Sequence, residues 1–207
     1  MSRDVELLYE LSALRHIPRQ WVRFGMPGVS RLAEHHYQVA WIALILAARI
    51  KEKVDTDKVL KMALAHDIAE SRTNDVDYIS RQYVTKDEQR ALHDMLKGTS
   101  ISEEFESLIK EYEQRESLEA KIVKDADNLH VDLELCEQKE QGNGLPDKWR
   151  GNRDGVSRKK LFTAEAKQLY KELIDTAPSS WHTESPNNRV HSGDWVDIKK
   201  PRETNEN

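Results

Sequence analysis

The clearest periodic pattern of apolar residues lies between residues 31 and 51. Val39, Ile42 and Leu46 repeat at the spacing of one helix face, and this stripe extends back through His35. The longest uninterrupted apolar run of the chain falls in the same segment and is too short to span a bilayer. A buried helix is therefore expected here.

Further segments carry the apolar spacing of amphipathic helices. They are Val5–Leu14, Asp55–Glu70 with Asp55 or Thr56 as its cap, Lys86–Leu96, Glu103–Glu113, Ser117–Lys139 and Thr163–Asp175. Segments with Gly and Pro separate them at Ile17–Ser30 and Gly142–Pro146, and Asn74–Tyr78 predicts a turn. Since no period-2 run persists, the sequence predicts an all-α fold, a compact bundle of roughly six or seven helices.

One domain is expected over residues 1–182, followed by a polar, flexible C-terminal tail over residues 183–207. The tail is rich in Asn, Ser, Pro and charged residues, and such a composition buries little apolar area. Trp181 and Trp195 are the residues able to hold parts of it against the domain.

Charge and cysteine content limit the expected binding partners and the expected cellular location. The net charge of −5 leaves no excess of Lys and Arg for neutralising the backbone of a nucleic acid polymer. The single cysteine, Cys136, cannot form an internal disulfide, so a reducing, cytoplasmic location is expected. The N-terminus shows no apolar stretch typical of a secretory signal, and no membrane association is expected.

Four polar side chains interrupt apolar helical stretches. They are His35, the adjacent pair His66 and Asp67, and Asp127. A buried carboxylate is costly unless it is paired or binds a metal ion, and a neutral imidazole is a good ligand for transition metals. These residues can therefore make one divalent metal site, with positions left for water and a substrate oxygen.

Each of these residues also has an ordinary structural interpretation. A single His on an apolar face is more often a hydrogen-bonded core residue, and a single Asp is more often a helix cap or a surface residue. Adjacent residues of a helix point about 100° apart, so His66 and Asp67 can meet one ion only at the edge of a groove between helices. The order of the four residues along the chain is what favours a metal site.

That order, His, then His-Asp, then Asp, resembles the HD superfamily of metal-dependent phosphohydrolases. The segments 33–40 (AEHHYQVA), 65–70 (AHDIAE) with Asn74-Asp75 downstream, and 119–127 (EAKIVKDAD) are similar to those of the YfbR-like 5′-deoxynucleotidase branch. The similarity runs from about Leu14 to Gly142. It implies that His35, His66, Asp67 and Asp127 bind the metal ion.

The resemblance also implies roles for residues around the metal ion. Glu70 would be the general acid or base that handles a proton, and Asp75 would contribute to catalysis and contact the sugar. Arg19 would bind the phosphate with its planar guanidinium. Trp21 would contact the substrate, although Gln20 stands where the bacterial enzymes have the aromatic residue. Asn74 likewise replaces a Gly that commonly precedes the Asp.

Two other histidines compete for the same roles. His36 also lies on an apolar stripe, and the resemblance selects His35 because it directly follows the acidic Glu34. The pair His93-Asp94 has charged neighbours and is predicted to lie on the surface.

The expected activity is metal-dependent removal of the 5′-phosphate from a deoxynucleoside monophosphate or a related small nucleotide. The ion is one of Mn, Co, Zn, Fe or Ni, which ligand types alone do not separate. The resemblance implies a homodimer. Two alternatives stay open: a deoxynucleoside triphosphate hydrolase or other nucleotide phosphohydrolase, and a non-catalytic helical module that keeps a metal ion in a closed shell.

Overall fold

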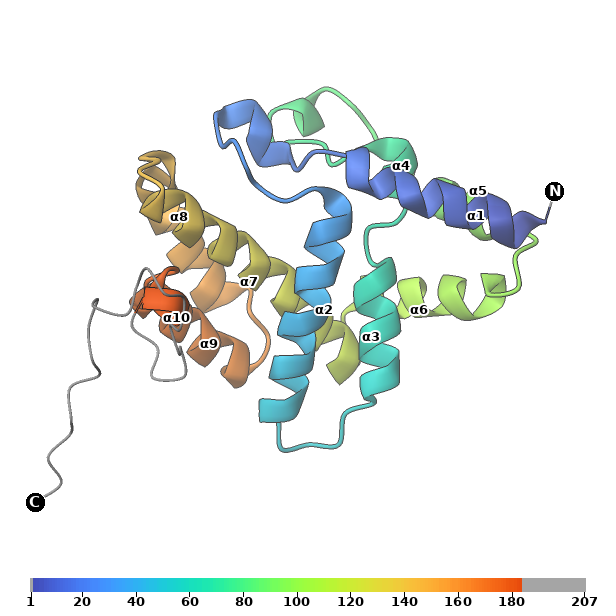
Figure 1. Cartoon of the computed structure of the whole chain (residues 1–207). Helices are drawn as coiled ribbons and strands as arrows, with labels where there is room; N and C mark the ends of the chain where they lie inside the picture. Colours follow the sequence, from blue (N-terminus) through green and yellow to red (C-terminus); the bar gives the residue numbers. More distant parts are fainter. Residues whose placement is uncertain (1, 184–207) are drawn as a thin grey trace, which may run out of the picture.

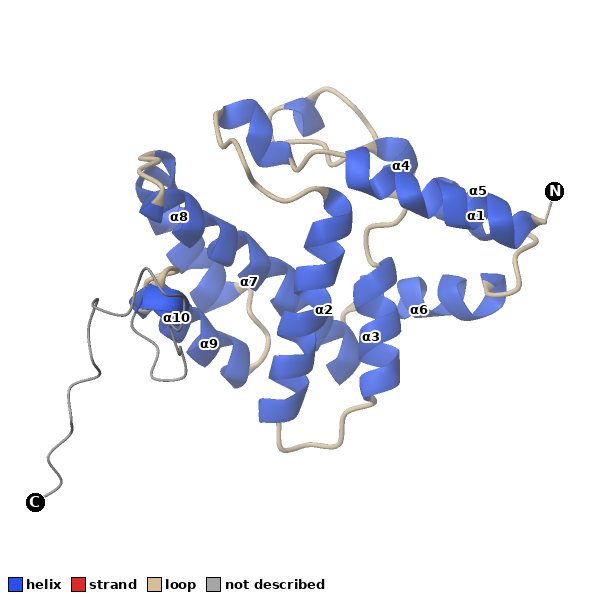
Figure 2. Cartoon of the chain, in the orientation of Figure 1, coloured by secondary structure: helices blue, strands red, loops and turns tan. Residues whose placement is uncertain are grey.

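A central helix, α2 (Leu32–Arg49), organises the fold (Figure 1). The computed structural model describes residues 2–183. Helix α3 (Thr56–Ala65) packs on one side of α2, and the long helix α7 (Leu118–Glu140) crosses it. Over this part of the chain Figure 2 shows helices and loops only, as the predicted all-α fold requires.

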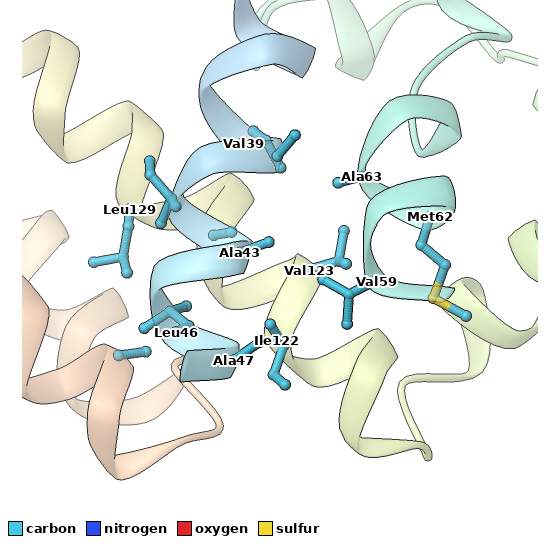
Figure 3. Packing of buried hydrophobic residues seen from close by; sticks show 14 of the residues in the cluster. Val39, Ala43, Leu46, Ala47, Val59, Met62, Ala63, Ile122, Val123 and Leu129 are labelled. Atoms are coloured by element: carbon cyan, nitrogen blue, oxygen red, sulfur yellow. The ribbon is translucent and has the colours of Figure 1, made fainter. Parts of the chain in front are cut away.

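The main core forms where α2, α3 and α7 meet. Figure 3 shows apolar side chains from all three helices in one cluster, which includes Val39 from α2, Met62 from α3 and Leu129 from α7. Each of these three is fully buried. Helix α9 (Ala164–Asp175) packs on α7 and adds Tyr170 to the same cluster. Burial of this joint face supplies the main stabilisation of α2, α3 and α7.

Side-chain caps fix where several helices begin. Asp55 accepts a hydrogen bond from the backbone N–H of Lys58 (3.1 Å), and this begins α3. Ser117 and Thr163 cap α7 and α9 in the same way. Of the two predicted caps, Asp55 and Thr56, the structure uses Asp55.

A second apolar cluster joins the N-terminal segment to the rest of the fold. It includes Leu7 of α1 (Arg3–Ser12), Leu14 of the 3₁₀ turn η1 (Ala13–His16), Leu32 at the start of α2, and Met95 of α5 (Glu88–Leu96). Ile109 of α6 (Ser102–Gln114) completes it. The first residues of α2, which include His35, are thereby held between two packed clusters.

The structure corrects the predicted helices in two places. The third helix ends at Ala65 instead of Glu70, and a turn over residues 66–69 leads into the one-turn helix α4 (Glu70–Thr73). Helix α8 (Leu145–Lys159) was not predicted, because Gly142–Pro146 was interpreted only as a break. Pro146 stands in the first turn of α8, where its missing N–H costs nothing.

Short helical turns η2 (Gln20–Phe24), η3 (Ser80–Gln82) and α10 (Ser180–Thr183) are also present.

The predicted tail lies almost entirely outside the described residues, which end at Thr183, so the boundary at residue 182 stays a prediction. Trp195 lies outside them too, and Trp181 is largely exposed. None of the described helices has an apolar stretch of the length that a bilayer crossing needs.

Candidate metal centre

His35 sits in the first turn of α2, and its imidazole is completely buried. The carboxylate of Glu34 accepts a hydrogen bond from the backbone N–H of Arg31 (2.6 Å), which fixes the start of the helix. The Nε2 atom of His35 lies 3.3 Å from Oδ1 of Asp127, on α7, and 3.8 Å from Oδ2 of Asp67. The predicted first histidine and the predicted last aspartate are therefore brought together by the crossing of α2 and α7.

His66 and Asp67 stand in the turn that follows α3. Both side chains reach toward His35 of α2, as expected of adjacent residues at the edge of a groove between helices. Nε2 of His66 lies 3.3 Å from Oδ2 of Asp67 and 3.2 Å from Nε2 of His35. Nδ1 of His66 lies 2.9 Å from the carbonyl oxygen of Ala63, which can only accept a hydrogen bond, so the proton of the neutral imidazole is on Nδ1.

The chemistry of this group fits a cation. Ligand atoms of His35, His66, Asp67 and Asp127 all lie within 4.8 Å of one another. Ligands about 2.1 Å from one shared ion stand roughly 3–4 Å apart, as most of these atoms do. Once Nδ1 of His66 carries its proton, its Nε2 is a lone-pair acceptor that faces two carboxylates. Two imidazole nitrogens and two carboxylate oxygens converging in this way suit a divalent transition metal ion.

The pKa values of the four candidate ligands are shifted by burial and by one another's charges. Burial disfavours a proton on His66, but Asp67 and Asp127 outweigh this effect and raise its pKa above the ordinary value. Burial alone would raise the pKa of Asp67, and the neighbouring His66 lowers it instead. Burial and then Arg19 lower the pKa of His35 to about 4. A divalent ion would compete with the proton that the two carboxylates otherwise attract to His66.

Glu70 is buried at the first position of α4 and lines a small cavity together with His66 and Asp67. Lys86 donates a hydrogen bond to Oε1 of Glu70 (2.7 Å), whereas Oε2 is buried without a partner. Burial, with the nearby charges of Asp67 and Asp75, raises the pKa of Glu70 to about 8 despite Lys86. The carboxyl group is therefore poised to exchange a proton near neutral pH, beside two of the candidate ligands.

Arg19 and Asp75 form a buried pair at the other predicted positions. The guanidinium Nη1 lies 3.3 Å from Oδ2 of Asp75, and Nε of Arg19 is buried without a partner. The backbone N–H of Gln20 donates to Oδ2 of Asp75 and its side-chain amide to Oδ1. Both carboxylate oxygens of Asp75 therefore contact the Arg19–Gln20 segment, and Asp75 holds Arg19 in place.

Trp21 packs against α8. Its ring lies 5.2 Å from the ring of Trp149 on α8, and it contacts the small cluster of Met26, Val131 and Leu135. Its indole Nε1 is buried without a partner. The structure therefore gives Trp21 a packing contact with α8, and its role toward the substrate stays a prediction.

The competing histidines do not enter the group of four. His36 is buried, with its ring centroid 4.7 Å from that of His66, but it is not among the four residues whose ligand atoms converge. His93 is exposed and pairs with Glu106 (3.2 Å), in agreement with its predicted surface position.

The sequence did not single out three residues that touch the site. Lys86 reaches Glu70, and Lys124 donates to Oδ2 of Asp127 (2.7 Å). His130 is buried on α7, and its Nδ1 lies 2.8 Å from Nδ1 of His35. One signal was available for His130, since it follows Asp127 at a spacing that places both on one face of α7.

Comparison with known proteins agrees with this geometry. The model of a family described as HD domain matches residues 11–169. The 5′-deoxynucleotidase HDDC2 of Dictyostelium discoideum is 29% identical over 159 residues, covering 72% of this chain and 84% of the relative. The 5′-deoxynucleotidase HDDC2 of Bos taurus is 28% identical over 145 residues, covering 67% of this chain and 69% of the relative. A solved structure described as a conserved hypothetical protein from Pyrococcus furiosus superposes with a TM-score of 0.72 and 26% identity, covering 83% of this chain and 99% of that chain.

Because the family match spans well over half of the sequence, this chain belongs to the HD-domain family. The predictions of an HD-domain fold and of an HD-domain enzyme are confirmed. The predicted class, a metal-dependent nucleotide phosphohydrolase, agrees with the names of the relatives.

Proposed function

We propose that this chain removes the 5′-phosphate from deoxynucleoside monophosphates, with one divalent transition metal ion bound by His35, His66, Asp67 and Asp127. The observation that carries the proposal is the convergence of these four acceptor groups beside the buried carboxyl of Glu70. The relatives named 5′-deoxynucleotidases support the substrate class. A bound ion in such a site supplies Lewis acidity, which lowers the pKa of a water molecule and polarises a phosphoryl oxygen.

Glu70 is assigned the proton transfer. With a pKa of about 8 it holds its proton at neutral pH, and it can donate that proton to the oxygen that leaves phosphorus. Lys86 holds the carboxyl group through Oε1 and leaves Oε2 without a hydrogen-bonding partner, so that Oε2 is available for the proton transfer. Either residue could be replaced without removing a metal ligand.

Arg19 is assigned the binding of the substrate's phosphate group. It is buried and charged, because the carboxylates of Asp75 and Asp127 outweigh its burial and hold its pKa above the ordinary value. Asp75 occupies Nη1, which leaves the unpartnered Nε edge for phosphate oxygens. Asp75 then acts mainly by orienting Arg19, and its predicted contact with the sugar is kept as part of the same proposal.

The test is a hydrolysis screen of nucleoside and deoxynucleoside mono-, di- and triphosphates with Mn²⁺, Co²⁺, Zn²⁺, Fe²⁺ and Ni²⁺. We expect release of inorganic phosphate from the deoxynucleoside monophosphates. Release of triphosphate from deoxynucleoside triphosphates would instead establish the triphosphate hydrolase. Stoichiometric metal binding without turnover of any nucleotide would establish the non-catalytic metal-binding module.

We also propose a homodimer through the face made by α2 and α3. Tyr37, Trp41 and Leu64 are each more than half exposed there, and they border an apolar groove of about 530 Å³. Exposed apolar patches of this kind are typical of protein interfaces. We expect a dimer in analytical ultracentrifugation and a monomer for Trp41→Glu; a monomeric wild type would refute the interface.

A cytoplasmic location is proposed on the ground of the single cysteine, Cys136. Microscopy of the tagged protein tests this location.

A further inference from the structure

The buried pair His35–His130 is not explained by the chemistry assigned so far. Both imidazoles are inaccessible to solvent, and their Nδ1 atoms lie 2.8 Å apart. His35 directs its other nitrogen, Nε2, toward Asp127, Asp67 and His66. His130 therefore contacts His35 on the side away from the candidate metal ion.

Counting protons fixes the roles within this pair. An imidazole that binds a cation through Nε2 needs a lone pair there, so the one proton of neutral His35 must be on Nδ1. At 2.8 Å that N–H donates a hydrogen bond to Nδ1 of His130. His130 can accept it only as the neutral ring whose proton is on Nε2.

The tautomer of His66, the other candidate histidine ligand, is fixed by a backbone group. Nδ1 of His66 has the carbonyl oxygen of Ala63 at 2.9 Å, and a carbonyl oxygen can only accept. The hydrogen-bonding partner of His35 Nδ1 is a side chain, whose own proton could sit on either nitrogen. The tautomer of His35 therefore depends on which nitrogen of His130 is protonated.

We propose that His130 is a positioning residue: it accepts the hydrogen bond from Nδ1 of His35 and thereby keeps Nε2 of His35 free to bind the metal ion. The inference rests on the proposed metal centre and deepens it. Partners of this kind are worth about 10–100-fold in metal affinity.

Glu134 is the other possible hydrogen-bonding partner of Nδ1 of His130. Its Oε2 lies 3.9 Å from Nδ1 of His130, too far for a hydrogen bond, while its Oε1 accepts from the N–H (2.8 Å) and the hydroxyl (2.5 Å) of Ser30. A proton on Nδ1 of His130 directed at Glu134 would force His35 into the tautomer that cannot bind metal through Nε2. Ser30 anchors Glu134 away from that contact.

The experiment combines metal affinity with direct observation of the tautomer. Affinity for Zn²⁺ is measured by competition against a chelator for the wild type, His130→Leu, His130→Asn and Glu134→Gln. We expect His130→Leu, which has no acceptor, to bind Zn²⁺ about 10–100-fold more weakly. His130→Asn, whose side-chain oxygen can accept near the position of Nδ1, should stay close to the wild type, as should Glu134→Gln. The matched control is His36→Gln, which changes another buried histidine beside the ligands and should not alter the affinity.

The tautomer is observed in the Zn²⁺-loaded wild type by ¹⁵N NMR of the histidine rings, so the test does not depend on the folding of any variant. A proton on Nδ1 of His35 supports the proposal, and a proton on Nε2 overturns it. Unchanged affinity in a folded His130→Leu variant overturns it as well, and so does loss of affinity in Glu134→Gln to the level of His130→Leu. If the wild type binds no Zn²⁺, Co²⁺ or Mn²⁺, the proposed metal centre is wrong. If the wild type binds metal and His130→Leu binds it equally well, only the proposed role of His130 is wrong.

Discussion

Replacing Glu70 by glutamine should change the pH dependence of stability in a direction that the structure fixes. The pKa of Glu70 is raised from the ordinary value of 4.5 to about 8, mainly by burial. Between these two values the folded chain holds a proton that the unfolded chain has lost, so stability falls as the pH rises toward 8. From pH 6 to full ionisation the loss is about two pH units at about 1.4 kcal/mol each, or roughly 2.7 kcal/mol. An amide side chain cannot titrate in this range, so the Glu70→Gln variant should escape this loss.

The assay is urea unfolding of the metal-free wild type and Glu70→Gln at pH 6 and pH 9. The matched control is Glu88→Gln, which removes an exposed carboxylate that pairs with the same Lys86 (2.5 Å). We expect the control to follow the wild type and Glu70→Gln to gain relative stability at pH 9. Parallel profiles for all three proteins would refute the reasoning, because they would mean that Glu70 ionises in the folded chain as it does in the unfolded one.

The same variant has a kinetic consequence, and three further changes test the remaining assignments. Glu70→Gln should lower kcat by roughly 10²–10⁴-fold with KM and metal content nearly unchanged, since only the proton transfer is lost; steady-state kinetics and metal analysis check this. Asp67→Ala and Asp127→Ala should lose the metal ion in elemental analysis, whereas His36→Gln should keep it; full occupancy in either Asp variant would show that the ligand assignment is wrong. Arg19→Ala should raise KM, and Arg19→Lys should fail to restore it because an ammonium lacks the two-pronged geometry; a lysine variant with wild-type KM would contradict the phosphate contact. Truncation after Thr183 should leave turnover unchanged, and a large fall without unfolding in circular dichroism would place part of the site in the removed segment.

Most of the fold could be predicted because its helices carry their own signals. The stripe of Val39, Ile42 and Leu46 predicts α2 within a residue or two at each end, and Asp55 predicts where α3 begins. These features are local: a helix face and a capping side chain can be read from neighbouring residues. The order of the four candidate ligands was also visible, although their convergence depends on how α2, α3 and α7 pack.

Helix α8 could not be predicted because its stabilising contacts are long-range. It contains Gly151 and Gly155, which disfavour a helix interior, and it buries few side chains. Its position depends on the packing of Trp149 against Trp21 and on a paired guanidinium, in which Arg153 donates to both oxygens of Asp132 (2.7 and 2.8 Å). Neither contact has a sequence signature within the helix.

The early end of α3 at Ala65 is the departure on which the site depends. The apolar pattern continues through Ile68 and Ala69, so nothing in the sequence marks the break. A continuous helix would point His66 and Asp67 about 100° apart, so that both could meet one ion only at the edge of a groove between helices. In the structure Nε2 of His66 and Oδ2 of Asp67 lie 3.3 Å apart. The early end of the helix leaves the carbonyl of Ala63 in the last turn of α3, where carbonyls have no partner within the helix, and Nδ1 of His66 lies 2.9 Å from its oxygen. The end of α3 therefore fixes the tautomer of His66 through a backbone carbonyl, whereas His35, inside the unbroken helix α2, needs another side chain for the same purpose.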